Sequence, residues 1–282
     1  MKNRLKTIGT KFQPTKTVCL ALGFVGAVGL FHSPSATAQE YSDFSDTNGL
    51  VLNGSAAQVG SVLRLTPATG TDHYKASAWH QNRQNVRNGF ETTFQFQISE
   101  RDAKLGGADG IAFVIQNQSL DALGAAGGGM GYGEDKTTKA KGISNSVAIE
   151  LDTYMNPVHS DTTANSISVH TNGTGPNNAS ETFSIGSVEA NSDMSDGAVH
   201  TVKIVYVPGR LDIYLDDLTS PALSVRLNLN TTLDLFRGQA YVGFTSSLAT
   251  ARENHDILNW SFSPTRADNS TTLPDALPDT YR

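Results

Sequence analysis

Short apolar or alternating runs, separated by clusters of Gly, Asn, Asp and Ser, follow one another from residue 50 to residue 262. The alternation is clearest where Phe94, Phe96 and Ile98 would share one face of a strand. A turn at Pro208-Gly209 separates two later runs, and no segment keeps a helical period. Examples of the expected strands are residues 61–66, 90–98, 110–116, 147–154, 166–171, 200–206, 210–216, 241–246 and 258–262.

So many short strands, with no helices between them, predict an all-β fold of two packed sheets, a jelly-roll sandwich. One domain over residues 39–264 accounts for all of them. The last segment, residues 265–282, is rich in Pro, Asp and Thr. We expect it to form a flexible tail.

The first 38 residues have the pattern of an export signal. They hold five basic and no acidic residues, then an apolar run at 18–31, then Ala36-Thr37-Ala38. These three parts predict cleavage after Ala38 and a secreted, periplasmic or extracellular protein. An uncleaved membrane anchor is the alternative, but the apolar run is short for a hydrocarbon core of about 30 Å. We therefore expect no membrane span.

Composition narrows the possible partners. The 282 residues carry a net charge of −6, and without the first 38 they hold 16 basic against 27 acidic residues, a net charge of −11. So acidic a chain would not bind a phosphate backbone, which excludes nucleic acid. The single cysteine, Cys19, lies in the export signal, so the mature chain has no disulfide. The missing cysteines, the signal and the simple tail favour a bacterial source.

An acidic segment near the middle of the chain is the strongest candidate for site chemistry. Residues two apart share a face of a strand, so Glu150, Asp152 and Tyr154 would point the same way. Neighbouring carboxylates repel unless a proton or a cation neutralises them, and a hard cation takes carboxylate, amide and carbonyl oxygens. A solvated acidic strand end would show the same residues. The candidate calcium ligands are Asp152, the carbonyl of Tyr154, Asn156 and Asp161.

Five stretches in order resemble the legume-type (L-type) lectins, and together they span nearly the whole mature domain. Val-Ala-Ile-Glu-Leu-Asp-Thr-Tyr-Met-Asn at 147–156 resembles the metal-loop signature of that family. The other four are Phe44 with the strand up to Leu63-Arg-Leu-Thr66, Ala-Asp-Gly-Ile-Ala-Phe at 108–113, Gly-Gly-Gly-Met-Gly-Tyr at 127–132, and Tyr-Val-Gly-Phe-Thr-Ser-Ser at 241–247 with Ile-Leu-Asn-Trp-Ser-Phe at 257–262. The resemblance implies a carbohydrate-binding lectin that holds calcium through the ligands named above.

The same resemblance implies a second site, for a transition metal, next to the calcium. Its ligands would be Glu150, Asp152, Asp161 and a histidine on the following strand. The chain departs from the family here, because Ser166 stands where that histidine is expected, and a hydroxyl is a poor ligand for a transition metal.

Two other histidines lie near this segment. His170 falls four positions later than Ser166, about 13 Å along the strand, and His159 lies in the loop, from which it could reach inward or face solvent. We therefore expect calcium to be retained and the second site to be weak, water-filled or empty.

The sugar site that the resemblance implies needs a carboxylate, amide donors and an aromatic ring. Asp109 would accept hydrogen bonds from two sugar hydroxyls, after a cis peptide bond. The Asn156 amide and a backbone N–H of Gly127 or Gly128 would donate, since glycine lets the main chain approach closely. The ring of Tyr154 would lie against the C–H face of the sugar.

The connection at residues 248–256, between the two C-terminal strands, is the remaining candidate for specificity. Its polar residues could contact outlying hydroxyls or a second sugar, although an ordinary hairpin connection would carry a similar composition. The sequence does not distinguish mannose or glucose from galactose specificity. A homodimer through a flat outer sheet is possible.

Two other functions compete with a non-catalytic lectin. Some glycoside hydrolases of this fold carry Glu-x-Asp-x-Glu on a strand, and hydrolysis needs two carboxylates that flank the bond. Here Tyr154 takes the third position, which favours binding over catalysis. A structural adhesion module that has lost sugar binding is the third possibility, because the change at Ser166 weakens the metal network.

Overall fold

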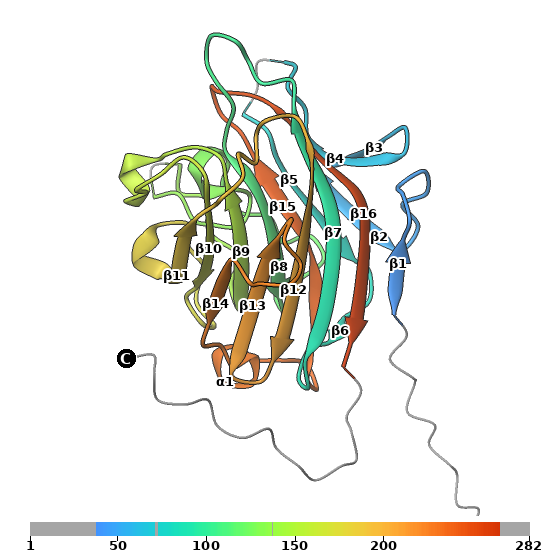
Figure 1. Cartoon of the computed structure of the whole chain (residues 1–282). Helices are drawn as coiled ribbons and strands as arrows, with labels where there is room; N and C mark the ends of the chain where they lie inside the picture. The colour runs from blue at the N-terminus through green and yellow to red at the C-terminus, as the bar shows by residue number, and fades with distance from the viewer. Residues whose placement is uncertain (1–37, 71–72, 137, 266–282) are drawn as a thin grey trace, which may run out of the picture. The chain divides into compact units, whose positions relative to one another are not determined.

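The computed structural model describes residues 38–70, 73–136 and 138–265. In this part of the chain two antiparallel sheets lie face to face (Figure 1), so the expected all-β jelly-roll sandwich is confirmed. The predicted export signal (1–38) and C-terminal tail (265–282) lie outside the described residues, apart from residues 38 and 265 themselves.

The first sheet has eight strands. Its order is β14 (Leu223–Val225), β13 (Arg210–Leu215), β12 (Val199–Val207), β7 (Phe90–Ser99), β16 (Asn254–Pro264), β4 (Val62–Thr66) and β3 (Ala57–Val59), and β1 (Gln39–Tyr41) also pairs with β16.

The second sheet also has eight strands and carries the candidate site. Its order is β11 (Ser184–Glu189), β10 (Ser166–Thr171), β9 (Ser146–Asp152), β8 (Gly110–Gln116), β15 (Gln239–Ser247), β5 (Lys75–His80) and β2 (Leu50–Gly54), and β6 (Gln84–Asn85) also pairs with β15. The helical turns are short: η1 (Gly127–Gly129), η2 (Pro157–His159), η3 (Glu181–Phe183) and α1 (Leu229–Thr232).

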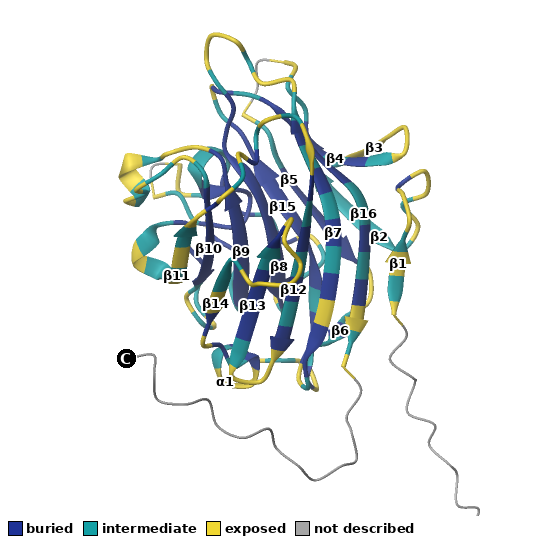
Figure 2. Cartoon of the chain, in the orientation of Figure 1, coloured by how far each residue is buried: buried dark blue, intermediate teal, exposed yellow. Residues whose placement is uncertain are grey.

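The core between the sheets comes from the alternation seen in the sequence. Along β7 the inward residues Phe94, Phe96 and Ile98 are buried, while the residues between them are partly exposed. Phe244 of β15 packs edge-on against Phe94 and Trp260, with ring centroids 5.0 Å away in each case. Figure 2 shows the buried residues gathered on the strands and the exposed ones in the connections.

A second, smaller apolar cluster covers the outer face of the second sheet. It includes Trp79, Val114 and Ala148 from the strands and Met130 and Tyr132 from the glycine-rich segment. Because of this cover, β8 and β9 are buried along their whole length. The same cluster also buries the polar side chain of Glu150 on β9.

Most predicted strands differ from the observed ones by three residues or fewer at each end, but two differences matter. The predicted strand 147–154 ends at Asp152, because the backbone N–H of Tyr154 donates to Asp152 Oδ1 at 2.8 Å and turns the chain. The last strand begins at Asn254 rather than residue 258, which takes the last third of the expected 248–256 connection into the sheet. In the described ranges, no helix is long and apolar enough to cross a membrane.

Candidate functional site

The register of the second sheet brings four strand ends together. Gly110 of β8 is paired with Asp152 of β9 and with Ser247 of β15, and Asp152 is paired in turn with Ser166 of β10. Loops that follow or precede these residues therefore meet at one edge of the sheet. The glycine-rich turn joins them there, because Ser247 Oγ donates to the carbonyl of Gly127 at 2.6 Å.

Asp109 is fixed at this edge by its backbone. Its N–H donates to the carbonyl of Ser247 at 3.0 Å, and its carbonyl accepts from the N–H of Thr153 at 3.1 Å. The peptide bond between Ala108 and Asp109 is cis, as the sequence resemblance implied. The two backbone bonds tie the residue to both neighbouring strands, so the position of its carboxylate is set by the sheet.

Three of the predicted sugar-binding residues meet here. Asn156 Nδ2 donates to Asp109 Oδ1 at 3.2 Å, although 47 residues separate them. Gly128 lies so close that an added Cβ would stand 3.0 Å from Asn156 Cγ and 2.7 Å from the ring of His159. A side chain here would have to displace His159 or Asn156, which agrees with the role expected for the turn. His159 thus lies over the glycine-rich turn and is half-buried. It neither reaches inward to the metal ligands nor faces solvent fully, the two alternatives that the sequence left open.

Tyr154, another predicted sugar-binding residue, is placed differently from the expectation. Its side chain is 39% exposed, and the chain has already left β9, so Glu150, Asp152 and Tyr154 do not share one strand face as predicted. The hydrogen bond from the Tyr154 N–H to Asp152 Oδ1 turns the chain and displaces the side chain. Its carbonyl stays with the site, 3.5 Å from Asn156 Nδ2.

The carboxylates at this edge raise one another's pKa. Burial, followed by the charges of Glu150, Asp161 and Asp109, raises the pKa of Asp152 to about 9. Burial is also the main cause that raises the pKa of Asp161 to about 6 and that of Asp109 to about 6. A bound cation would remove the repulsion between such closely spaced, buried carboxylates.

The surrounding donors have the chemistry of a calcium site. Asp161 Oδ2 accepts from the backbone N–H of Asn156 at 2.7 Å, which folds the loop back over the end of β9. The loop thus carries Asp161, Asn156 and the Tyr154 carbonyl to the neighbourhood of Asp152. A set of two carboxylates, an amide oxygen and a backbone carbonyl is what a hard cation prefers. These residues fit calcium.

Glu150 has a different environment. The hydroxyl of Tyr132 donates to Oε1, the hydroxyl of Ser168 donates to Oε2 at 2.7 Å, and His170 Nε2 lies 2.9 Å from Oε2. Burial alone would raise the pKa of Glu150, but His170 and the two hydroxyls hold it below its usual value. Both oxygens of the carboxylate are therefore already satisfied by protein groups.

The residues around Glu150 do not fit a transition metal. Ser166 supplies no imidazole where the resemblance requires one, and both Glu150 oxygens have protein partners. In the described parts of the chain, no three His, Cys, Asp or Glu side chains group as a metal site. We derive no role through such a metal.

His170 lies four residues from Ser166 along β10, but it contacts Glu150 on the neighbouring strand. Glu150 is paired across the ladder with Ser168, so it lies between Ser166 and His170 rather than beside Ser166 alone. A histidine two residues along the strand is a diagonal neighbour, and diagonal side chains of this length meet.

The polar residues of the 248–256 connection are mostly buried, while Thr250 is exposed and Arg252 partly exposed. Glu253, Asn254, His255 and Asp256 are all buried. Asp256 forms a two-pronged pair with Arg64, with N–O distances of 2.7 and 2.8 Å. Only Ala249 of this connection lines the cavity beside the glycine-rich turn.

Sequence reasoning missed a buried carboxylate that supports the site. Glu253 accepts from the hydroxyl of Thr153 at 2.8 Å and from the hydroxyl of Ser195, and His255 Nε2 lies 3.5 Å from it. Thr153 stands between Asp152 and Tyr154, so this carboxylate anchors the loop that carries the calcium ligands. Burial alone would raise the pKa of Glu253, but His255 and the two hydroxyls outweigh burial and lower this pKa below its usual value. Its position in a polar run gave no signal in the sequence.

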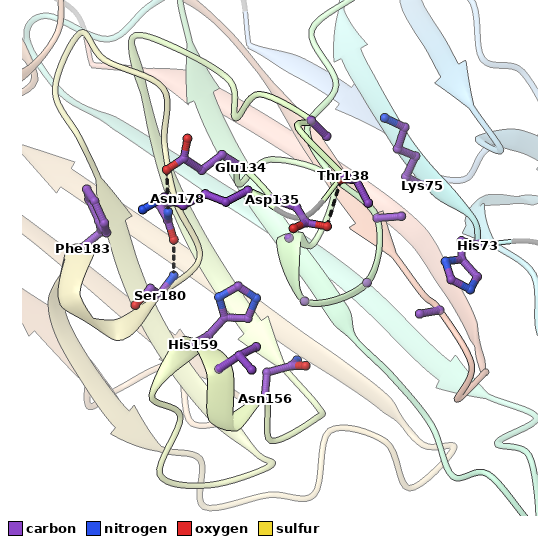
Figure 3. Close-up of a pocket in the computed structure, with 18 of the residues that line it drawn as sticks. His73, Lys75, Glu134, Asp135, Thr138, Asn156, His159, Asn178, Ser180 and Phe183 are labelled. Atoms are coloured by element: carbon purple, nitrogen blue, oxygen red, sulfur yellow. Dashed lines mark hydrogen bonds between the residues drawn. The ribbon is translucent and has the colours of Figure 1, made fainter.

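A cavity of about 790 Å³ opens beside these residues. Gly127, Gly128, Asn156 and His159 form part of its wall (Figure 3). Asp109 and Tyr154 are not among the residues that line it. Asp109 adjoins the lining through Asn156, whose Nδ2 donates to its Oδ1.

The comparison with protein families decides the identity. The model of the legume lectin domain matches residues 37–277. The chain belongs to the legume lectin family. Legume lectins bind carbohydrate and are not catalytic, so this membership confirms the expectation that the protein is not an enzyme.

Individual relatives of this legume lectin are distant. The L-type lectin-domain containing receptor kinase SIT1 of Oryza sativa subsp. japonica is 26% identical over 90% of the chain, which spans 41% of that kinase. The Flt3 receptor-interacting lectin of Lablab purpureus is 28% identical over 83% of the chain and 92% of its own length. The chain spans less than half the length of the receptor kinases it matches.

Solved structures agree at the level of the fold. The lectin UEA-II complexed with galactose superposes with a TM-score of 0.65 at 21% identity, over 82% of this chain and 99% of that one. The relatives named here with a source are plant proteins, so they lend no support to the expected bacterial source.

Proposed function

We propose that this legume lectin binds a single saccharide unit of a glycan in a calcium-dependent way, without altering it. The observation that carries the proposal is the meeting of Asp109 and Asn156, with Nδ2 and Oδ1 3.2 Å apart beside Gly128. A carboxylate, an amide and a closely approaching main chain are the groups that a polyol needs.

The carboxylate of Asp109 has capacity for a ligand. Its Oδ2 is buried and has no hydrogen-bond partner among the described residues, and a buried acceptor without a donor is costly. A sugar hydroxyl is a donor of suitable size. The N–H groups of Gly127 and Gly128 begin a helical turn and so have no acceptor within it, which supports their role as donors to the sugar.

We propose that calcium is held by Asp152, the Tyr154 carbonyl, Asn156 and Asp161. When bound, Ca²⁺ would neutralise the carboxylates at the end of β9 and hold the loop that carries Asn156. Asn156 would then serve both sites, since its oxygen could bind the cation while its Nδ2 remains a donor. Glu150 lies outside this set, because protein groups already satisfy it.

The ligand class is a neutral hexose of mannose, glucose or galactose type. UEA-II was solved with galactose, which supports but does not decide a galactose-type ligand. The expected export near Ala38 would place the lectin in the periplasm or outside the cell, where it would meet glycans. A homodimer through the outer sheet and a bacterial source stay predictions.

Glycan-array binding tests the proposal. Wild-type protein should bind a defined set of glycans in calcium, lose that binding in EDTA and regain it when calcium is restored. Asp109→Asn keeps the shape of the side chain but removes the charge that accepts from the hydroxyls, so it should abolish binding. Absence of binding to every glycan with calcium present would instead favour a structural module.

A further inference from the structure

A glycan longer than one sugar must leave the monosaccharide site in some direction. In the connection at residues 248–256, the polar residues from Glu253 to Asp256 are buried and offer it no contact. The cavity leads the other way from Gly128 and Asn156, toward the loop before η3. With about 790 Å³ it falls in the range of roughly 300–1,000 Å³ that is typical of ligand sites.

The far wall of the cavity carries a fixed row of polar groups. Asn178 Nδ2 donates to Glu134 Oε1 at 3.0 Å, and Asn178 Oδ1 accepts from the N–H of Ser180 at 2.8 Å. Figure 3 shows Glu134, Asn178 and Ser180 joined in this row above His159. Asn178 is buried and the backbone N–H of Glu134 bonds the carbonyl of Asn177 at 3.0 Å. The row is therefore held in place before any ligand arrives, which lowers the entropic cost of binding.

An aromatic ring stands beside this row. Phe183 ends η3, lines the cavity and is only partly buried. A partly exposed phenylalanine next to hydroxyl, amide and carboxylate groups repeats the combination that the monosaccharide site offers. Aromatic rings pack against the apolar C–H face of a sugar, while the polar groups bond its hydroxyls.

The charges that line the cavity balance. The lining holds two basic residues, Lys75 and Lys136, and two acidic ones, Glu134 and Asp135. The Lys75 ammonium is already bonded to the carbonyl of Gly124 at 2.8 Å. With no excess of either sign, the cavity has no preference for an anionic sugar such as a uronic acid. A neutral unit fits it better.

We propose that the wall formed by Glu134, Asn178, Ser180 and Phe183 is a second subsite, which binds the next neutral sugar of an oligosaccharide. This inference rests on the proposed function, because the first sugar must occupy the site at Asp109. The ligand class is therefore a neutral oligosaccharide of at least two units, reaching from Gly128 toward η3.

Isothermal titration in calcium tests the subsite, with methyl α-D-galactopyranoside and methyl α-D-mannopyranoside as single units and neutral trisaccharides that end in the same sugars. The trisaccharide should bind about tenfold more tightly than its own single unit, a gain of the size that one good aromatic and hydrogen-bonding contact supplies. Phe183→Ala should remove this gain and leave the affinity for the single unit unchanged.

Two further variants sharpen the result. Glu134→Gln keeps an oxygen for Asn178 but turns the other acceptor into a donor, so it should reduce the gain several-fold. Ile185→Ala removes another exposed apolar side chain, outside the cavity, and should leave both affinities unchanged. Equal affinities for single unit and trisaccharide, or a gain that survives Phe183→Ala, would overturn the subsite and leave the proposed function standing. Failure of every sugar to bind would overturn both, and tighter binding of uronic-acid trisaccharides would overturn the neutral ligand.

Discussion

His170 Nε2 on β10 lies 2.9 Å from Glu150 Oε2 on β9, and both side chains are buried. The contact joins a histidine and a carboxylate at the place where the family resemblance implied a transition metal. Burial alone would lower the pKa of His170, but the charge of Glu150 raises it above the usual value. The pair therefore supplies, from within the chain, a positive partner for Glu150.

Loss of this pair should destabilise the fold. His170→Ala leaves the Glu150 carboxylate buried with hydroxyl partners only, and removal of one member of a buried pair costs about 3–5 kcal/mol. The free energy of unfolding in urea should fall by about that amount. The exposed His73 provides the control, since His73→Ala should change the unfolding free energy little. Equal stabilities of the two variants would contradict the assignment.

Metal content should reflect the same pair. Dialysis against calcium and manganese, followed by elemental analysis, should find a single calcium per chain and no tightly held manganese. The physical reason is that Glu150 is already satisfied and Ser166 offers no imidazole. Tight manganese binding that disappears in Glu150→Gln would show that the second site is functional after all.

The close approach at the glycine-rich turn should be sensitive to a single methyl group. Gly128→Ala would put a Cβ 2.7 Å from the His159 ring and 3.0 Å from Asn156 Cγ. Overpacking of this kind costs about 1–3 kcal/mol of folding stability. If Asn156 is displaced to relieve it, affinity for the sugar should fall about fivefold, which corresponds to about 1 kcal/mol. Adding His159→Ala should recover part of the loss, because it removes the nearer of the two clashes. If the double variant binds no better than Gly128→Ala, the clash is not the cause.

Glu253 should act on binding through the loop that it anchors. Glu253→Gln keeps the shape but leaves one hydroxyl, from Thr153 or Ser195, without its acceptor, at a cost of about 1–3 kcal/mol. Urea unfolding should show that loss, and calcium affinity should fall because Thr153 adjoins Asp152. Glu189→Gln, at an exposed carboxylate of β11, is the matched control. Unchanged calcium affinity in Glu253→Gln would confine Glu253 to a stabilising role.

Much of the fold could be read from the sequence, because the alternation of Phe94, Phe96 and Ile98 depends only on which face of a strand meets the core. It was harder to predict which residues meet at one edge of the sheet. Tyr154 leaves the strand through a local hydrogen bond to Asp152, and a two-residue period takes no account of such turns. The buried state of Glu253 and His255 depends on packing against distant strands.

His170 shows the same limit at the candidate site. The distance between His170 and Ser166 follows from the spacing of residues along one strand. The contact of His170 with Glu150 depends instead on the register between β9 and β10. Spacing within one segment does not determine that register. Asp109, Gly128 and Asn156 could be brought together beforehand only because the family resemblance linked three separate segments.

The most direct test of the sugar site is a crystal structure of the protein grown with calcium and soaked with a galactoside or a mannoside. The account predicts one sugar ring whose hydroxyls lie within hydrogen-bond distance of the Asp109 carboxylate, Asn156 Nδ2 and a backbone N–H of Gly127 or Gly128. A sugar bound elsewhere on the sandwich, with Asp109 making no contact to it, would contradict the account.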